Sequence, residues 1–383
     1  MAQRLKTDWI LFVTVLAMMS FGVLILYSAS SIMAELDPRY GSSWHFVALQ
    51  AVWAAVAVGL MMALKKVHYR NFQTPAVAFG AIGIALMLLF AVYFMDGEHH
   101  RWLRLYGPLG GQPSELAKPA LVVFLAFFVT WRGRAINNPR YTLIPAALAV
   151  GLIIFAVVVA DLGTAVVLGA AAMAVFFVAG LEWRYCFIVA VVAGLGVCVF
   201  IAKEPYRLGR VVRFFDPDFK IVAKFDHQGR IKAWTENSLR THDTNYQLQQ
   251  SKIAVGAGGV TGVGLMNGRQ KLLYLPFAHT DFIYAVAGEE LGLMGSCVLL
   301  FGFGVIFWRG LRAALLINDD FGRYLALGVT VIVTAQAFIN MSVVLGMMPT
   351  KGISLPLISY GGSSLLSTLA LLGILMNVSE HAG

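Results

Sequence analysis

The sequence predicts an all-α, polytopic integral membrane protein with about ten transmembrane helices. Of its 383 residues, 59% are hydrophobic and only 13% are charged, and the mean hydropathy is +0.75. A soluble domain of this length cannot bury so much apolar surface. The apolar runs are also long enough to cross a bilayer as helices. These observations exclude an ordinary soluble protein.

Ten apolar segments are the candidate spans, and we expect the short fourth one to begin within the preceding loop. The first is too long for a signal peptide and lacks a small-residue cleavage pattern, so we expect it to be retained. An odd number of cysteines, all in apolar spans, argues against a disulfide framework or a metal site. The spans cover residues 9–31, 44–64, 75–95, 116–129, 143–160, 162–181, 185–202, 282–308, 324–345 and 353–378.

The distribution of basic residues predicts that both termini are cytoplasmic. With the N-terminus inside, the short inner segments hold twelve Lys and Arg residues and the short outer segments hold five. Cytoplasmic loops normally carry this excess. The chain is then a single membrane domain over residues 1–383, with a large extracytoplasmic loop, 203–280, between helices seven and eight.

Four cations depart from this rule, because Arg101, Arg104, Lys118 and Lys351 fall outside, close to helix ends. One interpretation is snorkelling or contact with lipid headgroups. The other, which we favour for the group, is a cationic pocket for a phosphate or pyrophosphate. Glu115 lies three residues before Lys118 on one helix, so the two side chains can also form a purely structural pair.

The long loop carries twelve basic and six acidic residues. This excess favours an anionic partner, and a lipid headgroup or lipid-linked diphosphate fits better than nucleic acid. Arg207, Arg210 and Arg213 recur every three residues and would form one stripe on a helix. Arg213 is a candidate substrate contact, although an interfacial helix lying on headgroups is the more ordinary interpretation.

Two further segments of the loop have recognisable patterns. Residues 219–245 contain two alternating stretches around a turn-like Asp226-His-Gln-Gly229, which predicts a β-hairpin. The glycine-rich run 256–268 lacks the strand–turn–helix context of a dinucleotide-binding fingerprint. We expect it to let backbone pack closely in a re-entrant or interfacial segment.

The stretch His279-Thr280-Asp281 places a carboxylate where the long loop re-enters the membrane. A charge kept at that position is a functional candidate by default. A carboxylate can deprotonate a sugar hydroxyl, and neighbouring cations can stabilise a departing lipid diphosphate. The alternative is structural, because Asp281 or Thr280 could cap the helix that follows.

A set of motifs runs from the first span to the last and resembles the SEDS family of bacterial cell-wall synthases. Ala278-His279 and the Pro-Thr-Lys-Gly motif resemble the division member more than the elongation member. Phe277 departs from the family, which has an acidic residue there, and residues 219–245 look like an insertion. The motifs are Tyr27-Ser-Ala-Ser-Ser31, Gln112-Pro-Ser-Glu-Leu-Ala-Lys118, Asp161-Leu-Gly-Thr164, Tyr274-Leu-Pro-Phe-Ala-His-Thr-Asp-Phe282, Gly288-Glu-Glu-Leu-Gly292, Pro349-Thr-Lys-Gly352 and Ile358-Ser-Tyr-Gly-Gly-Ser-Ser364.

The resemblance implies polymerisation of lipid II into glycan strands at the division septum, in the bacterial cytoplasmic membrane. It implies a class B penicillin-binding transpeptidase and other division proteins as partners, besides membrane lipids. Asp281 matches the family's essential aspartate, which implies a general base for an inverting displacement with undecaprenyl pyrophosphate leaving. Whether a divalent cation takes part is left open. The candidate substrate-binding residues are Arg101, Lys118, Lys351, Glu115, His279, Thr280, Arg213 and Ser363.

Three alternatives stay open at this point. Glu289 and Glu290 could form a relay in a lipid II flippase, or they could simply pair with neighbouring groups. The elongation-type polymerase is the second alternative, and a structural scaffold for a division complex is the third. For Ser363, in the small-residue stretch of the last span, close helix packing competes with substrate contact.

Overall fold

The computed structural model confirms an all-helical membrane protein. Within the described residues, nine helices are long and apolar enough to cross a membrane, and Leu162–Val178 is a shorter apolar tenth. The described part also contains one two-stranded antiparallel ribbon, β1 (Leu103–Arg104) with β2 (Gly110–Gly111). The structure describes residues 7–95, 102–104, 110–203, 205–216, 244–349 and 352–382.

The ten spans follow the predicted order along the chain. They are α1 (Trp9–Leu36), α2 (His45–Lys66), α3 (Pro75–Met95), α4 (Pro113–Arg132), α5 (Ile144–Ala160), α6 (Leu162–Val178), α7 (Trp183–Lys203), α12 (Ile283–Leu316), α13 (Asp320–Val344) and α14 (Gly362–His381). The connecting elements are the short helical turns η1 (Tyr69–Phe72), η2 (Gly133–Ala135) and η3 (Pro139–Leu143), and the helices α8 (Pro205–Phe215) and α11 (Thr244–Gly258).

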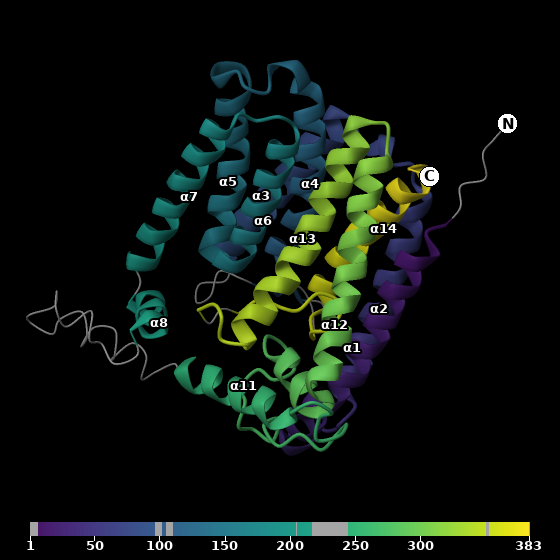
Figure 1. Ribbon diagram of the computed structural model, residues 1–383, viewed down its shortest axis with the longest axis vertical. Coiled ribbons are helices and arrows are strands. Elements are labelled where there is room, and N and C mark those ends of the chain that lie inside the picture. Colours follow the sequence, from purple (N-terminus) through teal and green to yellow (C-terminus); the bar gives the residue numbers. More distant parts are fainter. Residues whose placement is uncertain are drawn as a thin grey trace, which may run out of the picture.

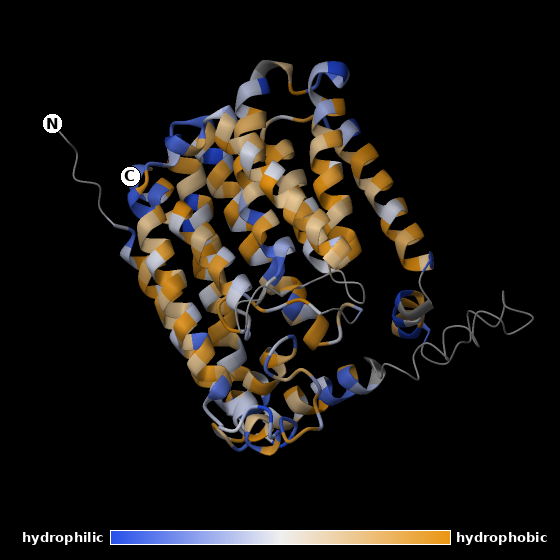
Figure 2. Cartoon of the chain, turned by 180° about the vertical axis from the view of Figure 1, so that it is seen from behind, coloured by the Kyte–Doolittle hydropathy of each residue, from blue (hydrophilic) through white to orange (hydrophobic). Residues whose placement is uncertain are grey.

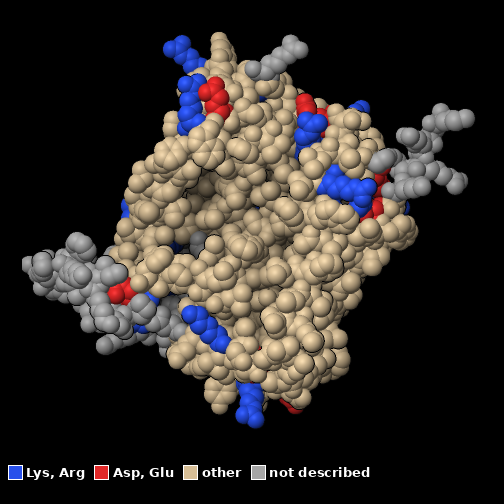
Figure 3. Space-filling view, in the orientation of Figure 1, with Lys and Arg blue, Asp and Glu red and all other residues tan. Residues whose placement is uncertain are grey.

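The helices form one bundle with both chain ends at the same end of it (Figure 1). An even number of spans requires this arrangement. The segment that contains α8 and α11 lies at the opposite end. Hydrophobic residues dominate the spans (Figure 2), and charged side chains gather near the two ends of the visible face, leaving a largely uncharged band between them (Figure 3). This distribution is the one that a bilayer requires.

Three helices form the centre of the bundle. In the most apolar windows of α4, α13 and α14, 78%, 72% and 72% of the residues are buried, against 6% for α7. α13 packs on α4, α6 and α12, and α14 packs on α2. Any side chain that needs protein partners is therefore best placed on α4, α13 or α14.

Several predicted boundaries differ from the structure, among them the ends of α1 and α12, and two of the differences have a local cause. α4 begins at Pro113 rather than at residue 116, as the expected overlap with the preceding loop allows, because proline suits the first turn of a helix. The last span was predicted from residue 353, which is wrong, since α14 begins only at Gly362. Pro356 has no amide hydrogen to continue a helix through this stretch, and the chain from 352 to 361 is not helical.

The glycine-rich run packs closely against α12, as expected from its glycines, and it does so at a break in that helix that was not predicted. Gly292 has φ 65° and ψ −159° and interrupts the helix. The amides of Val263 and Gly264 donate to α12 carbonyl groups before the break, at 3.0 Å each. The amides of Leu293 and Met294 donate to loop carbonyl groups at 2.9 and 3.1 Å. The loop thus supplies hydrogen bonds that the broken helix lacks.

The predicted hairpin at 219–245 lies outside the described residues, apart from its last two positions, which begin α11.

Substituting Gly292 by alanine should destabilise the fold by about 2–4 kcal/mol. A Cβ at this position combines an unfavourable positive φ with a clash against the carbonyl of Val260, at 2.6 Å from its oxygen. Thermal unfolding of the purified protein in detergent measures the effect. Gly304→Ala is the matched control, because that Cβ meets nothing within 4 Å and should be neutral or mildly stabilising. Equal melting temperatures for both variants would contradict the interpretation.

Candidate functional site

Asp281 lies immediately before α12, at the end of the bundle opposite the termini. Phe282 occupies the N-cap position of the helix, and no side-chain hydrogen bond caps it. The N-cap position of α12 is thus occupied by Phe282 and not by Asp281 or Thr280, the two residues considered for it. The Thr280 hydroxyl instead donates to the Phe277 carbonyl at 3.3 Å. The Asp281 side chain is half-buried.

The segment that carries Asp281 is attached to the non-helical stretch before α14. Ser359 Oγ donates to the Thr280 carbonyl at 2.6 Å, and the Tyr360 amide donates to the His279 carbonyl at 3.0 Å. The His279 ring lies 5.0 Å from the ring of Phe46 on α2 and 6.0 Å from that of Tyr360. The predicted neighbours His279 and Thr280 therefore hold Asp281 through their backbone and ring contacts.

Gly352 approaches the carboxylate closely. A Cβ built on Gly352 would lie 2.7 Å from Asp281 Oδ2, so only glycine allows this approach. Asn340, on α13, fixes the same geometry from the backbone side. Its Nδ2 donates to the Asp281 carbonyl at 2.8 Å and to the Ile353 carbonyl at 2.6 Å. The stretch that follows Lys351 is thereby held directly against Asp281.

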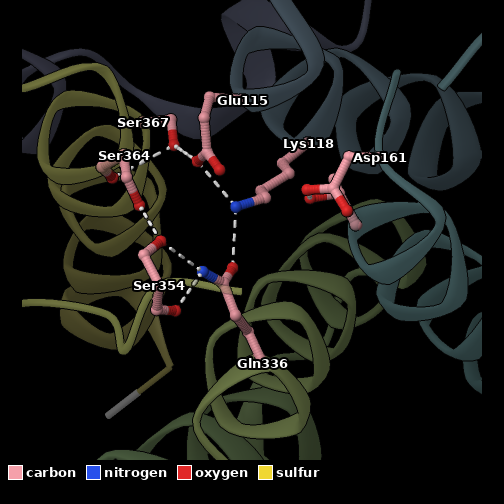
Figure 4. Close-up of polar contacts among 8 residues, drawn as sticks. Glu115, Lys118, Asp161, Gln336, Ser354, Ser364 and Ser367 are labelled. Atoms are coloured by element: carbon pink, nitrogen blue, oxygen red, sulfur yellow. Dashed lines mark hydrogen bonds and ion pairs between the residues drawn. The ribbon is translucent and has the colours of Figure 1, made fainter. Parts of the chain in front are cut away.

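Glu115 and Lys118 form a second, buried polar cluster (Figure 4). Lys118 is 1% exposed, and its Nζ donates to Glu115 Oε2 at 2.6 Å and to Gln336 Oε1 at 2.7 Å. Ser367 Oγ donates to the same Glu115 oxygen at 2.9 Å. Asp161 lies beside Lys118 in Figure 4 and also caps α6 through the Gly163 amide, at 2.8 Å. The predicted Glu115–Lys118 pairing is what the structure shows.

One face of α13 joins the two clusters. Gln336 and Asn340 are four residues apart, so their side chains share a face. Gln336 Nε2 donates to the Ser354 carbonyl at 2.9 Å, one residue beyond the carbonyl that Asn340 binds. Ser354 Oγ lies 3.0 Å from Ser364 Oγ at the start of α14. Hydrogen bonds therefore connect Lys118 through Gln336 to Ser354, and connect the adjacent Ile353 through Asn340 to the backbone of Asp281.

A cation from α8 completes the surroundings of Asp281. Burial lowers the pKa of Arg210 to about 10, while the negative charge of Asp281 opposes that shift. Arg210 therefore lies within electrostatic reach of the carboxylate. The predicted residue of this stripe, Arg213, is half-buried three positions further along α8.

Several expected site residues are placed differently or not described. Arg101 and Lys351 lie outside the described residues. Ser363 is in the first turn of α14, but the neighbouring Ser364 makes the hydrogen bond to Ser354. The site residues that were not predicted as such are Asn340, Gln336, Ser354, Ser364, Gly352 and Arg210. The sequence did carry a signal for Gln336 and Asn340, because two amide side chains four residues apart are unusual in an apolar span.

Glu289 and Glu290 are both engaged within the fold. Glu289 accepts hydrogen bonds from the Arg269 and Gln270 amides, the shortest at 2.7 Å. Glu290 Oε1 pairs with Lys271 Nζ at 2.6 Å and accepts from Ser28 Oγ at 2.5 Å. These contacts fit the structural interpretation of the two glutamates better than a relay.

No cluster of three or more His, Cys, Asp or Glu side chains suited to a metal ion occurs among the residues that could be described.

Replacing Lys118 by methionine should cost about 3–5 kcal/mol, because it leaves the Glu115 carboxylate buried without its cation. The double variant Glu115→Gln/Lys118→Met removes both charges and should recover most of the loss. Thermal unfolding measures both. Arg323→Met is the control, since Arg323 forms the same i,i+3 pair with Asp320 on the surface, where it contributes less than about 1 kcal/mol. A Lys118→Met protein as stable as Arg323→Met would refute the assignment.

His279 should make stability depend on pH. Burial lowers its pKa to about 4 from an ordinary 6.5. The unfolded chain then binds a proton at a higher pH than the folded one, so stability is complete above pH 6.5 and declines as the pH falls toward 4. The loss should reach up to about 3 kcal/mol. Unfolding of wild type and His279→Gln across this range is the measurement, and an equal slope in both proteins would exclude His279 as the cause.

Comparison with known proteins identifies the family. Residues 8–383 match the family model of the FtsW, RodA and SpoVE proteins, described as "Cell cycle protein". A relative from Geobacter sulfurreducens, named "Probable peptidoglycan glycosyltransferase FtsW", is 36% identical over 382 residues, covering 98% of this chain and 96% of its own. The stage V sporulation protein E of Bacillus subtilis is 32% identical over 385 residues, covering 99% of both chains.

Two solved structures extend the comparison. A chain described under "Structural coordination of polymerization and crosslinking by a peptidoglycan synthase complex" superposes with a TM-score of 0.75 at 29% identity, covering 99% of both chains. The rod shape determining protein RodA of Thermus thermophilus superposes with a TM-score of 0.65 at 26% identity, covering 98% of this chain and 97% of its own. The resemblance found in the motifs is thus confirmed over the full length, and the chain belongs to the SEDS family of FtsW, RodA and SpoVE proteins.

Proposed function

We propose that this protein is a peptidoglycan glycosyltransferase that polymerises lipid II into glycan strands during cell division, as its FtsW-named relatives suggest. The observation that carries the proposal is the half-buried Asp281 carboxylate, held against Gly352 and within reach of the Arg210 charge. A base and a cation at the same end of a membrane bundle are what transfer from a lipid diphosphate requires.

Asp281 acts in this proposal as the general base. Its carboxylate accepts the proton of the acceptor sugar hydroxyl while that oxygen attacks the anomeric carbon of the donor. The bond from that carbon to the diphosphate breaks in the same displacement, which inverts the configuration through an oxocarbenium-like transition state. Asn340 keeps the base in place by holding its backbone carbonyl.

The leaving diphosphate needs positive charge rather than a strong acid. Among the described residues, Arg210 can supply this charge, because it lies within electrostatic reach of Asp281. Arg101 and Lys351 remain predictions from the sequence for the same role. Lys118 is engaged by Glu115 and Gln336, so a diphosphate would have to displace one of them to reach it. We therefore assign Lys118 first to holding α4 against α13 and α14.

The distribution of basic residues and the comparisons together support a proposal for the surroundings of the reaction. With both termini in the cytoplasm, Asp281 faces the outer side, where lipid II presents its sugars. The neighbour from a peptidoglycan synthase complex supports a transpeptidase partner of the class B penicillin-binding type. We assign the protein to the cytoplasmic membrane at the division septum. The roles of Glu289 and Glu290 in the fold favour polymerisation over lipid transport.

The Asp281→Asn variant tests this proposal. Asparagine preserves the size and the backbone contacts but cannot accept a proton at neutral pH, so polymerisation should fall by roughly two or more orders of magnitude. Purified protein is incubated with lipid II, with its partner added where needed, and the glycan product is resolved on a gel. Thermal unfolding in parallel shows whether the variant is folded.

Asp320→Asn is the control, because Asp320 lies in the first turn of α13 beside Arg323, at the other end of the bundle. It should retain full activity. A folded Asp281→Asn protein that polymerises at the normal rate would rule out the general base. A wild-type protein that makes no polymer would overturn the function itself.

A further inference from the structure

A partly open cavity lies at the end of the bundle where α1 begins and α14 ends. Its volume is about 350 Å³, and it lies between the first described residues, the end of α2 and the end of α14. This volume is in the range of small-molecule sites. Hydrophilic residues gather around this end in Figure 2. Its polar lining is chiefly basic, and comprises Lys65, Lys66, His68, His381, Asn377 and Glu380.

Part of this lining is committed to the fold. Lys65 Nζ lies 3.1 Å from Glu380 Oε1 and donates to Thr7 Oγ1 at 3.0 Å. Asn377 accepts from the Tyr69 amide at 2.8 Å and donates to the Lys65 carbonyl at 2.6 Å. Since Glu380 balances the charge of Lys65, the ammonium of Lys66 and the two imidazoles set the charge that the cavity presents to a ligand.

The hydrogen bonds fix how the imidazoles meet a ligand. His381 Nδ1 lies 2.7 Å from the Asn377 carbonyl, which can only accept, so the proton is on Nδ1. His68 Nδ1 accepts from the Arg70 amide at 3.2 Å, so in the neutral ring the proton is on Nε2. His68 thus offers a donor in its neutral form, whereas His381 offers a second donor only after it takes up a proton.

The two rings disfavour each other's charge. Their centroids are 4.3 Å apart. Burial lowers the pKa of His68, and the nearby His381 and Arg70 lower it further, while Asp319 opposes them. An anion between the rings would offset this repulsion and favour protonation. The positively charged groups around the rings are Lys65, Lys66 and Arg70, and the negatively charged groups are Glu380 and Asp319. The Asp8–Arg309 ion pair lies beside the end of α14.

We propose that this cavity is a binding site for a phosphate group. A phosphate carries enough acceptor oxygens for Lys66, His68 Nε2, protonated His381 and the Thr7 hydroxyl together. Lys65 and Lys66 form the last turn of a membrane span. The cavity is therefore at headgroup level, where the phosphate of an anionic lipid or a free phosphate could enter. This site is far from Asp281 and independent of the proposed reaction.

Binding of two probes to the purified full-length protein tests the proposal. Inorganic phosphate is titrated by calorimetry, and phosphatidylglycerol bound from nanodiscs is counted by native mass spectrometry against phosphatidylcholine. Lys66→Gln and His68→Gln should each weaken binding about tenfold, the loss of one charge-assisted contact. Wild-type binding should strengthen as the pH falls below about 6.5, the ordinary histidine value, because burial lowers the pKa of His68 and its protonation adds positive charge to the cavity, and His68→Gln should flatten that dependence.

Arg312→Gln is the matched control. It removes one positive charge near the C-terminal end of α12, at the same end of the bundle, and Arg312 does not line the cavity. It should bind like the wild type. Variant-sensitive binding of phosphatidylglycerol alone assigns the site to a lipid headgroup, and variant-sensitive binding of inorganic phosphate assigns it to a free anion. Both outcomes support a phosphate site. Binding of neither probe, or equal losses in Lys66→Gln and Arg312→Gln, overturns it.

Discussion

The satisfaction of backbone polar groups within an apolar bundle is the constraint on which the site depends. Between residues 352 and 361 the chain is not helical, so it satisfies only part of its own amide and carbonyl groups. Side chains satisfy others. Asn340 and Gln336, both on α13, donate to the consecutive carbonyl groups of residues 353 and 354. Gln50, on α2, donates to the Ser359 carbonyl. The same hydrogen bonds that make this stretch tolerable also bring Gly352 against Asp281.

The buried charges have a related effect. The Glu115–Lys118 pair lies between α4, α13 and α14, and each partner is hydrogen-bonded a second time, to Ser367 or Gln336. Removing two charges from water is costly, and the pair persists because these extra bonds satisfy it. Its geometry orients Gln336, and Gln336 in turn holds Ser354. Central helix packing and the position of the carboxylate are thus parts of one network.

The fold was largely readable from the sequence, because hydropathy and length decide which segments span a bilayer. The spacing of Glu115 and Lys118 also predicted their pairing, since it is local. The start of α14 was missed because residues 353–361 are as apolar as a span, and hydropathy does not register that Pro356 interrupts a helix there. Asn340 and Asp281 are 59 positions apart. No local pattern reveals that one binds the other.

The break at Gly292 separates the depth of Asp281 in the membrane from the length of the spanning part of α12. At 1.5 Å per residue, the 34 residues of α12 extend about 51 Å, well beyond the roughly 30 Å of a hydrocarbon core. Residues 293–316 alone extend about 36 Å, close to one bilayer crossing. Mismatch with a thinner or thicker bilayer is then absorbed by tilting of this part. The part before the break is tied to the glycine-rich loop, and residues 279–280, which precede α12, are tied to residues 359–360. The depth of the carboxylate is therefore set by the protein and not by the lipid.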